Sequence, residues 1–202
     1  MEQINNIKKL LNDINININN LINKNIKINL LNDIVKFNNT TTKIIKLNKS
    51  ATSQVYKDIN NKIVIKKIIN YQNYDVFERE IHLLKLLNCH NINIPKLLYY
   101  DIKNQIIIMS YCGTPINKQA FESNNNYKKQ LSNIIKELKK LNIKHNDIKH
   151  DSEILLLNNI IYLCDFGWAT INNNLHCNIN LCNKPKPFGI INDDIFLYSF
   201  DK

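Results

Sequence analysis

Lys144-His145-Asn146-Asp147-Ile148-Lys149 is the stretch of this chain that decides its fold, together with Asp165-Phe166-Gly167, which follows eighteen residues after Asp147. Between the two motifs lie two short apolar runs, residues 154–157 and 160–163, which predict the strands of a β-hairpin. Either motif alone would carry little information. Their order, and their separation by a hairpin, make a specific signal that selects Asp147 and Asp165 as candidate site residues.

The composition indicates one large domain or two small lobes. A chain of 202 residues is long enough to bury a genuine core. Its net charge of +10 comes mostly from lysines that are scattered singly, which is typical of a solvated surface. Because no compact basic run or Arg/aromatic cluster occurs, we do not expect a nucleic-acid partner. The charge would still attract phosphate-bearing substrates.

The cysteines and apolar runs favour an intracellular, cytoplasmic protein. The five cysteines lack zinc-type spacing, and several lie in apolar surroundings, as expected of reduced thiols. No uncharged apolar run is long enough to span a membrane, and the first residues lack the basic-then-apolar order of a signal peptide. We therefore expect no membrane association.

The amino-acid composition and the spacing of apolar residues change near residues 40–42. Residues 1–42 are biased toward Asn, Ile and Lys, and their apolar spacing predicts helices in an N-terminal extension. Codon usage in an AT-rich genome would produce the same bias, so the bias alone does not indicate a function. Residues 43–202 form the second unit.

From residue 43 onward, a β-rich half is followed by a helical half. Short runs rich in β-branched residues predict strands at 44–47, 55–58, 62–69, 96–100 and 105–111. Apolar residues at helical spacing predict one helix through residues 77–87 and another over 127–141. This order is typical of an α+β protein, with a small lobe at 43–112 and a partial large lobe at 113–202.

The segment from Lys43 to about Phe200 resembles eukaryotic-type protein kinases, the serine/threonine group in particular. The motifs that carry the resemblance stand in the family's order: Ile63-Val64-Ile65-Lys66, Arg79-Glu80-Ile81, Ile107-Ile108-Met109-Ser110-Tyr111-Cys112, the two aspartate motifs above, and Asp194-Ile195-Phe196. The resemblance implies a two-lobed kinase-like fold that lacks the last helices of the large lobe. It also implies ATP and Mg²⁺ as cofactors and a protein as substrate.

The resemblance gives each charged residue of these motifs a role. Lys66 would hold the α- and β-phosphates, and Glu80 would fix its ammonium group. Asp165 would bind Mg²⁺, Asp147 would accept the proton of the substrate hydroxyl, and Lys149 would reach the γ-phosphate. Each residue taken alone has an ordinary explanation as a surface charge or a turn. Four of them in the right order on the right elements favour the catalytic interpretation.

The same resemblance predicts the nucleotide pocket. Met109 takes the gatekeeper position, the backbone of Ser110 and Cys112 would face adenine, and Asp194 would buttress the catalytic loop. The residues assigned to the nucleotide are Asn48, Ser50, Ser53, Val55, Val64, Lys66, Glu80, Ser110, Cys112 and Ile154.

The chain departs from the family in its phosphate-covering loop. Asn48, Ser50 and Ser53 stand where three glycines are usual, and the whole chain has only three glycines. Because a Cβ atom hinders close approach of the backbone to phosphate, we expect weakened nucleotide binding. Val64 replaces an alanine above the adenine and narrows the pocket further.

Other departures concern the metal and regulation. Ser152 falls where an asparagine usually binds the second Mg²⁺, and Asp151 or Glu153 could substitute for it. Asn146 replaces the arginine that pairs with an activation-loop phosphate, so we do not expect phosphorylation of Thr170 to switch the protein on. No Ala-Pro-Glu motif occurs between residues 165 and 194.

Three functions therefore remain open. Lys66, Glu80, Asp147 and Asp165 favour an active serine/threonine kinase, whereas the glycine-free loop, Ser152 and the missing helices favour a pseudokinase that acts as a binding or scaffolding module. A small-molecule phosphotransferase shares the two aspartate motifs. Lys149 and the helix that contains Arg79-Glu80-Ile81 make this third interpretation the weakest.

Overall fold

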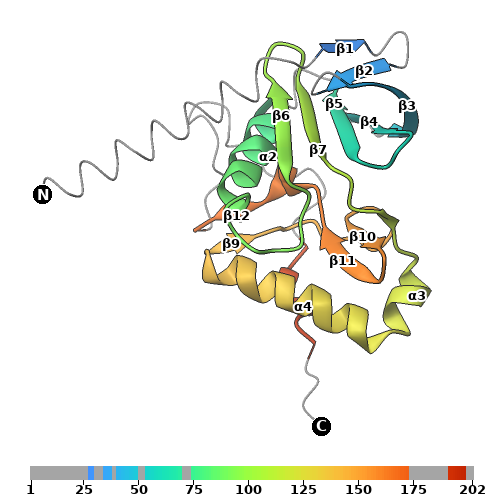
Figure 1. Cartoon of the computed structure of the whole chain (residues 1–202). Helices are drawn as coiled ribbons and strands as arrows, with labels where there is room; N and C mark the ends of the chain where they lie inside the picture. The colour runs from blue at the N-terminus through green and yellow to red at the C-terminus, as the bar shows by residue number, and fades with distance from the viewer. Residues whose placement is uncertain are drawn as a thin grey trace, which may run out of the picture.

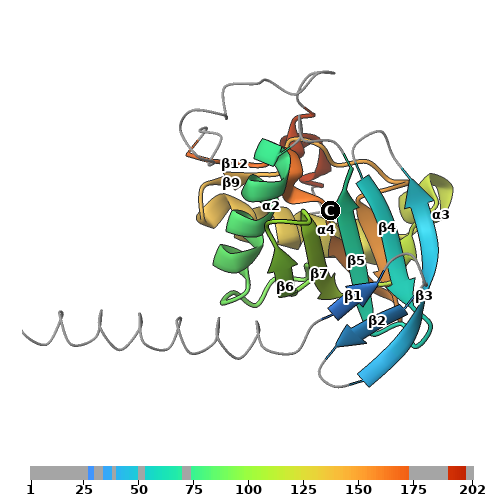
Figure 2. The same cartoon turned by 90° about the horizontal axis from the view of Figure 1, so that it is seen from above.

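The computed structural model describes residues 27–29, 34–37, 40–49, 53–69, 74–172 and 191–198. Its largest element is an antiparallel sheet with the strand order β1-β2-β3-β4-β5-β7-β6 (Figures 1 and 2). The strands are β1 (Lys27–Asn29), β2 (Ile34–Phe37), β3 (Thr40–Lys49), β4 (Ser53–Asp58), β5 (Ile63–Ile68), β6 (Leu97–Asp101) and β7 (Ile106–Ser110).

Alternation along β5 gives the sheet two different faces. Ile63 and Ile65 are buried in a small apolar cluster with Tyr56 and Ile108. Because successive side chains of a strand point to opposite faces, Val64 and Lys66 lie on the other side, where both line a cavity. The strand therefore carries a lysine into the interior without interrupting the apolar cluster.

Helix α2 (Tyr74–Leu87) packs on the cavity side of the sheet, beside β6 and β7 (Figures 1 and 2). Its apolar face buries Phe77, Ile81 and Leu84 in the main core, which also contains Ile107 of β7. This amphipathic packing fixes the rotation of the helix about its axis. The same rotation sets the direction of Glu80.

The described residues of the second half form two α-helices, two short 3-10 helices (labelled η) and short strands. The elements are β8 (Thr114–Pro115), α3 (Lys118–Glu122), α4 (Asn125–Lys140), β9 (Ile143–Lys144), β10 (Ile154–Leu157), β11 (Ile160–Leu163), η3 (Phe166–Trp168), β12 (Thr170–Ile171) and η4 (Asp193–Phe196). Asn124 caps α4 by accepting the backbone N–H groups of Asn126 and Tyr127. The helix then buries Leu131 and Ile135 in the same core as α2. Among the described residues, no helix is long and apolar enough to cross a membrane.

The mixed α/β composition and most element positions agree with the sequence prediction. The hairpin strands 154–157 and 160–163 have the predicted bounds. The prediction of helix around residues 34–35 is wrong, because this segment is β2 and pairs with β3, Ile34 opposite Lys43. The sheet thus continues into the region assigned to the extension. The helices predicted within residues 1–26 lie outside the described residues.

Candidate functional site

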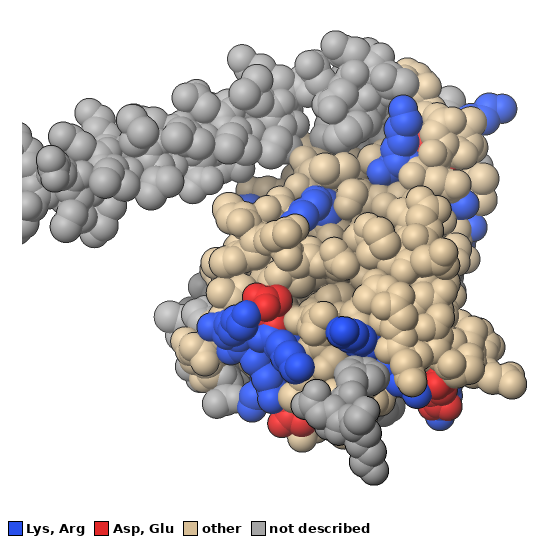
Figure 3. All heavy atoms as spheres, turned by 60° about the horizontal axis from the view of Figure 1, so that its bottom comes forward, with Lys and Arg blue, Asp and Glu red and all other residues tan. Residues whose placement is uncertain are grey.

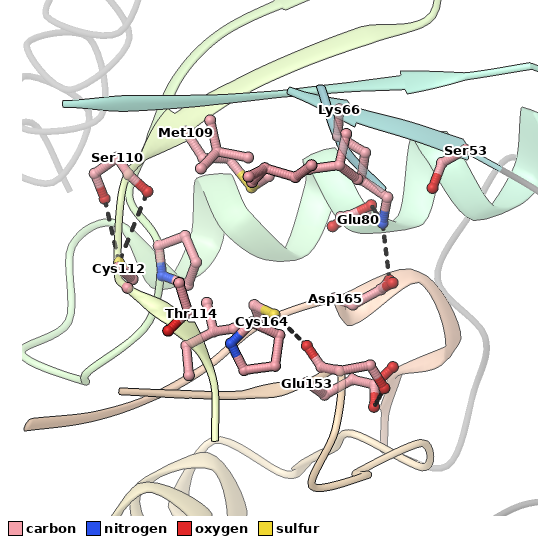
Figure 4. Close-up of a pocket in the computed structure, with 18 of the residues that line it drawn as sticks. Ser53, Lys66, Glu80, Met109, Ser110, Cys112, Thr114, Glu153, Cys164 and Asp165 are labelled. Atoms are coloured by element: carbon pink, nitrogen blue, oxygen red, sulfur yellow. Dashed lines mark hydrogen bonds and ion pairs between the residues drawn. The ribbon is translucent and has the colours of Figure 1, made fainter. Parts of the chain in front are cut away.

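A cavity of about 430 Å³ lies between the sheet and the segment that contains β8 and β10 (Figure 4). Seven of the residues assigned to a nucleotide from the sequence line it: Ser53, Val55, Val64, Lys66, Glu80, Ser110 and Cys112. Ser152 and Asp165, the predicted metal ligands, line it as well. The fold therefore brings residues that are far apart in the sequence together around one cavity.

Lys66, Glu80 and Asp165 form an ionic cluster at the wall of this cavity (Figure 4). The Nζ atom of Lys66 lies 2.7 Å from Oε2 of Glu80 and 2.9 Å from Oδ1 of Asp165. The three side chains come from β5, α2 and the residue before η3. The predicted contact between Lys66 and Glu80 is confirmed.

The charges of this cluster follow from burial and proximity. Burial works to lower the pKa of Lys66, but the neighbouring Asp165 and Glu80 carboxylates outweigh it and raise that pKa above its ordinary value. Burial raises the pKa of Glu80 to about 7, with Lys66 offsetting part of the effect. For Asp165, the attraction of Lys66 overcomes burial and lowers the pKa. Asp165 is thus ionised, and its side chain is 41% exposed, so it is available to a cation.

Asp165 occupies a left-handed backbone conformation, with φ 67° and ψ 71°. Asp tolerates this region because its short side chain can bond to nearby backbone. Here Oδ1 accepts the N–H of Gly167 at 3.4 Å while it also contacts Lys66. The turn therefore orients the carboxylate toward the cavity.

Asp147 lies next to this cavity without lining it. Lys149 links Asp147 to the cavity wall. Its Nζ lies 2.9 Å from Oδ1 of Asp147 and 3.5 Å from Oε1 of Glu153, and Glu153 lines the cavity. The backbone N–H of Asp147 donates to Nδ1 of His145 at 3.3 Å. Burial lowers the pKa of His145, so its ring is neutral, and its Nε2–H donates to the Cys164 carbonyl at 2.9 Å.

Asp193 supports the loop that contains His145 and Asn146. The prediction that Asp194 has this buttressing role is wrong by one residue. The buried Asp193 carboxylate accepts the backbone N–H of His145 at 2.5 Å and of Asn146 at 2.9 Å. Asn192 caps η4 by accepting the N–H of Asp194. The side chain of Asp194 is exposed and pairs with Lys139 on the surface.

Replacing Asp193 by alanine should lower the free energy of unfolding by about 2–3 kcal/mol, because two buried N–H groups lose their acceptor. The matched change Asp194→Ala removes a surface ion pair and should cost about 0.5 kcal/mol or less. Urea denaturation of both variants measures the difference. Equal losses would contradict the buttressing role of Asp193.

The residues predicted to bind a metal ion supply oxygen donors, but they do not form a complete metal site. The Ser152 hydroxyl donates to Oε2 of Glu153 at 2.5 Å, and both residues line the cavity with Asp165. Among the described residues, no group of three or more His, Cys, Asp and Glu side chains is arranged to hold a metal ion. Mg²⁺ in phosphate sites usually takes one or two carboxylates and completes its shell with phosphates and waters. The donors present fit that requirement.

Three nucleotide assignments need comment. Ile154 is fully buried in the core, and its neighbour Leu155 lines the cavity instead, because alternate residues of β10 face opposite sides. The assignment of Ile154 is therefore wrong by one residue. Asn48 pairs with Val55 through the backbone of β3 and β4, and Ser50 lies outside the described residues.

Sequence reasoning missed several lining residues: Leu47, Pro95, Gly113, Thr114, Pro115 and Cys164. Gly113 has a positional signal, since it follows the predicted adenine-facing segment. Its φ is +99°, and a Cβ atom there would lie 2.0 Å from the Leu156 carbonyl oxygen. Only glycine allows the chain to pass β10 so closely.

Asn146 contacts the segment that follows Asp165. Nδ2 of Asn146 donates to the Trp168 carbonyl at 3.0 Å and to Oγ1 of Thr170 at 3.1 Å. Thr170 is buried and also pairs with Lys144 across β12 and β9. Thr170 is thus a packed residue of this segment, held by Asn146 and by the pairing of β12 with β9.

Comparisons with known proteins give distant, partial matches. No family model matches the chain. An Aurora kinase of Saccharomyces cerevisiae is 29% identical over 117 residues, which are 52% of this chain and 31% of that protein, and one of Eremothecium gossypii matches to the same extent. A probable bifunctional tRNA threonylcarbamoyladenosine biosynthesis protein of Methanocaldococcus jannaschii is 28% identical over 95 residues, 47% of this chain and 17% of that protein. The chain thus spans less than a third of the length of these relatives. The matches give weak support to a protein-kinase-like relationship.

Proposed function

We propose that this chain is a two-lobed, protein-kinase-like phosphotransferase that uses ATP and Mg²⁺ and phosphorylates a serine or threonine hydroxyl of a protein in the cytoplasm. The observation that carries the proposal is the Lys66 ammonium held between Glu80 and Asp165 at the wall of the cavity. The distant similarity to two Aurora kinases supports the same class.

The cavity suits a nucleotide in size and lining. A volume of about 430 Å³ falls within the usual range for small-molecule sites. The apolar side chains of Val64, Met109 and Leu155 supply surfaces on which a base could pack, and the ionic cluster supplies a region for phosphates. Adenine would therefore lie toward Ser110 and Cys112, with the phosphates toward Lys66.

In this proposal, catalysis depends on placing charges around the transferring phosphoryl group. Lys66 would hold the nucleotide phosphates, and Asp165, with Ser152 or Glu153, would hold Mg²⁺, which neutralises phosphate charge. Asp147 would orient the attacking hydroxyl and accept its proton. Lys149, which contacts Asp147 in the structure, would move to a γ-phosphate oxygen.

Basic and acidic side chains lie close together on one face of the molecule. On the face drawn in Figure 3, basic side chains do not form one continuous patch and acidic ones lie among them. Lys139 pairs with Asp194, and Lys140 pairs with Glu137 at 2.6 Å. Such a mixed surface is typical of solvated charge.

The second candidate is a pseudokinase that binds partners without efficient transfer. Two observations favour it: the Ser152 hydroxyl is engaged by Glu153, and Lys149 neutralises Asp147. Both arrangements would have to change when Mg²⁺ and phosphate bind. Binding and transfer must therefore be measured separately.

Calorimetric titration with ATP, with and without Mg²⁺, tests the binding step. We expect magnesium-dependent binding by the wild type and a loss of about ten- to hundredfold in affinity for Lys66→Met, since a charge-assisted contact to phosphate disappears. Lys67→Met is the matched control, because Lys67 lies on the opposite face of the same strand and does not line the cavity. Failure of the wild type to bind ATP under both conditions would contradict the proposal.

A further inference from the structure

Arg79 is a fully buried charged residue that none of the roles above uses. It precedes Glu80 on α2, and it is 0% exposed. Its Nη1 donates to the Gly167 carbonyl at 2.5 Å, and its guanidinium carbon lies 5.5 Å from the centre of the Trp168 ring. One side chain of α2 therefore holds two residues of the turn that follows Asp165.

A second contact joins the same two elements. Gly167 packs so closely on α2 that a Cβ atom would lie 2.5 Å from Cγ1 of Val76. Val76, Arg79 and Glu80 are spaced i, i+3 and i+4, so they share one face of the helix. The helix face that presents Glu80 to Lys66 is thus the face that binds the turn carrying Asp165.

The cluster itself provides a reason for this attachment. Glu80 and Asp165 are both carboxylates, and both contact the single ammonium of Lys66. Repulsion between the two carboxylates offsets part of their attraction to Lys66, so the cluster alone holds α2 to the turn less firmly than two independent ion pairs would. A neutral carbonyl bound by a buried guanidinium holds the two elements together without adding negative charge.

We propose that Arg79 is a positioning residue for the phosphate site, which fastens α2 to the Asp165 turn so that Glu80 and Asp165 reach Lys66 together. Asn146 holds the other side of the turn through the Trp168 carbonyl. The proposal deepens the proposed function and rests on it for the identity of the ligand. Arg79 touches neither the substrate nor the metal in this scheme.

The experiment uses Trp168, the single tryptophan of the chain, as a reporter. Its emission spectrum and its quenching by acrylamide report the guanidinium contact in ligand-free protein, and calorimetry with ATP and Mg²⁺ reports the phosphate site. Arg79→Met should shift the emission, increase quenching and weaken magnesium-dependent ATP binding about ten- to hundredfold, the scale of a lost buried charged hydrogen bond. Arg79→Lys retains the charge and a donor and should recover part of both signals.

Lys85→Met is the matched control. Lys85 lies on the same helix, 4.1 Å above the ring of Tyr100, and it donates to the Tyr100 hydroxyl at the protein surface. This variant removes a cation–aromatic contact remote from the turn, so Trp168 emission and ATP affinity should both stay at wild-type values.

Two outcomes would overturn the proposal. The first is an Arg79→Met protein, folded at the assay temperature, whose only change is a lower melting temperature, which would mean a purely structural role. If Arg79→Met does not fold, the Arg79→Lys variant decides the question. The second outcome is an Arg79→Lys protein whose Trp168 emission and ATP affinity equal those of the wild type. If the wild type itself binds no ATP, the proposed function fails, whereas the emission of the ligand-free variants still tests the attachment of α2 to the turn.

Discussion

Asp147→Asn should lower the rate of phosphoryl transfer by about two orders of magnitude or more, with little change in ATP affinity. This is the usual scale for a positioned acid–base group, and the carboxamide cannot accept the hydroxyl proton. The side chain of Asp147 is 10% exposed and does not line the cavity, so its loss should leave nucleotide binding largely intact. Radiolabelled ATP and a panel of protein substrates would measure transfer, since the preferred protein is unidentified.

Asp194→Asn is the control for this measurement. It makes the same chemical change at an exposed residue whose partner is the surface residue Lys139, so transfer should be unaffected. If wild type and Asp147→Asn are indistinguishable across the panel while both proteins are folded, the catalytic interpretation fails. The pseudokinase interpretation would then remain.

Asp165→Asn should abolish the magnesium dependence of nucleotide binding while preserving the fold, because it changes the charge with little change of shape. The variant removes one negative charge from the cluster around Lys66, and Glu80 still contacts that ammonium. In the absence of Mg²⁺, we therefore expect the variant to bind free ATP at least as tightly as the wild type does.

Calorimetric titrations of both proteins, with and without Mg²⁺, give four affinities that test this expectation. The wild type should gain affinity when Mg²⁺ is added, and the variant should not. An equal gain in both proteins would refute Asp165 as the main metal ligand. Circular dichroism spectra would establish that the variant is folded.

Features determined by local pattern could be predicted from the sequence. The hairpin at 154–163 has two short apolar runs separated by a turn, and the structure has the same bounds. The contact between Lys66 and Glu80 could be predicted because the motifs that contain these two residues resemble those of protein kinases, in which the lysine and the glutamate pair. The order of the motifs then placed both residues near Asp165.

Features that depend on distant partners could not be predicted. Strand β2 is set by its pairing with β3, and this pairing overrides a locally helical spacing of apolar residues. The errors at Ile154 and Asp194 are each one residue, because the side of β10 and the cap of η4 are decided by tertiary packing. Arg79 reaches Gly167 across 88 residues of sequence, and neither motif indicates that contact.

Lys149 has a consequence for the order in which ligands would bind. Its ammonium is shared by Asp147 and Glu153, so the proposed proton acceptor is paired with a cation. An arriving nucleotide would compete for Lys149 through its terminal phosphate, and the Asp147 carboxylate could then exchange its contact with Lys149 for one with a hydroxyl. Steady-state kinetics would therefore show an ordered mechanism in which the nucleotide is the first ligand and the acceptor the second.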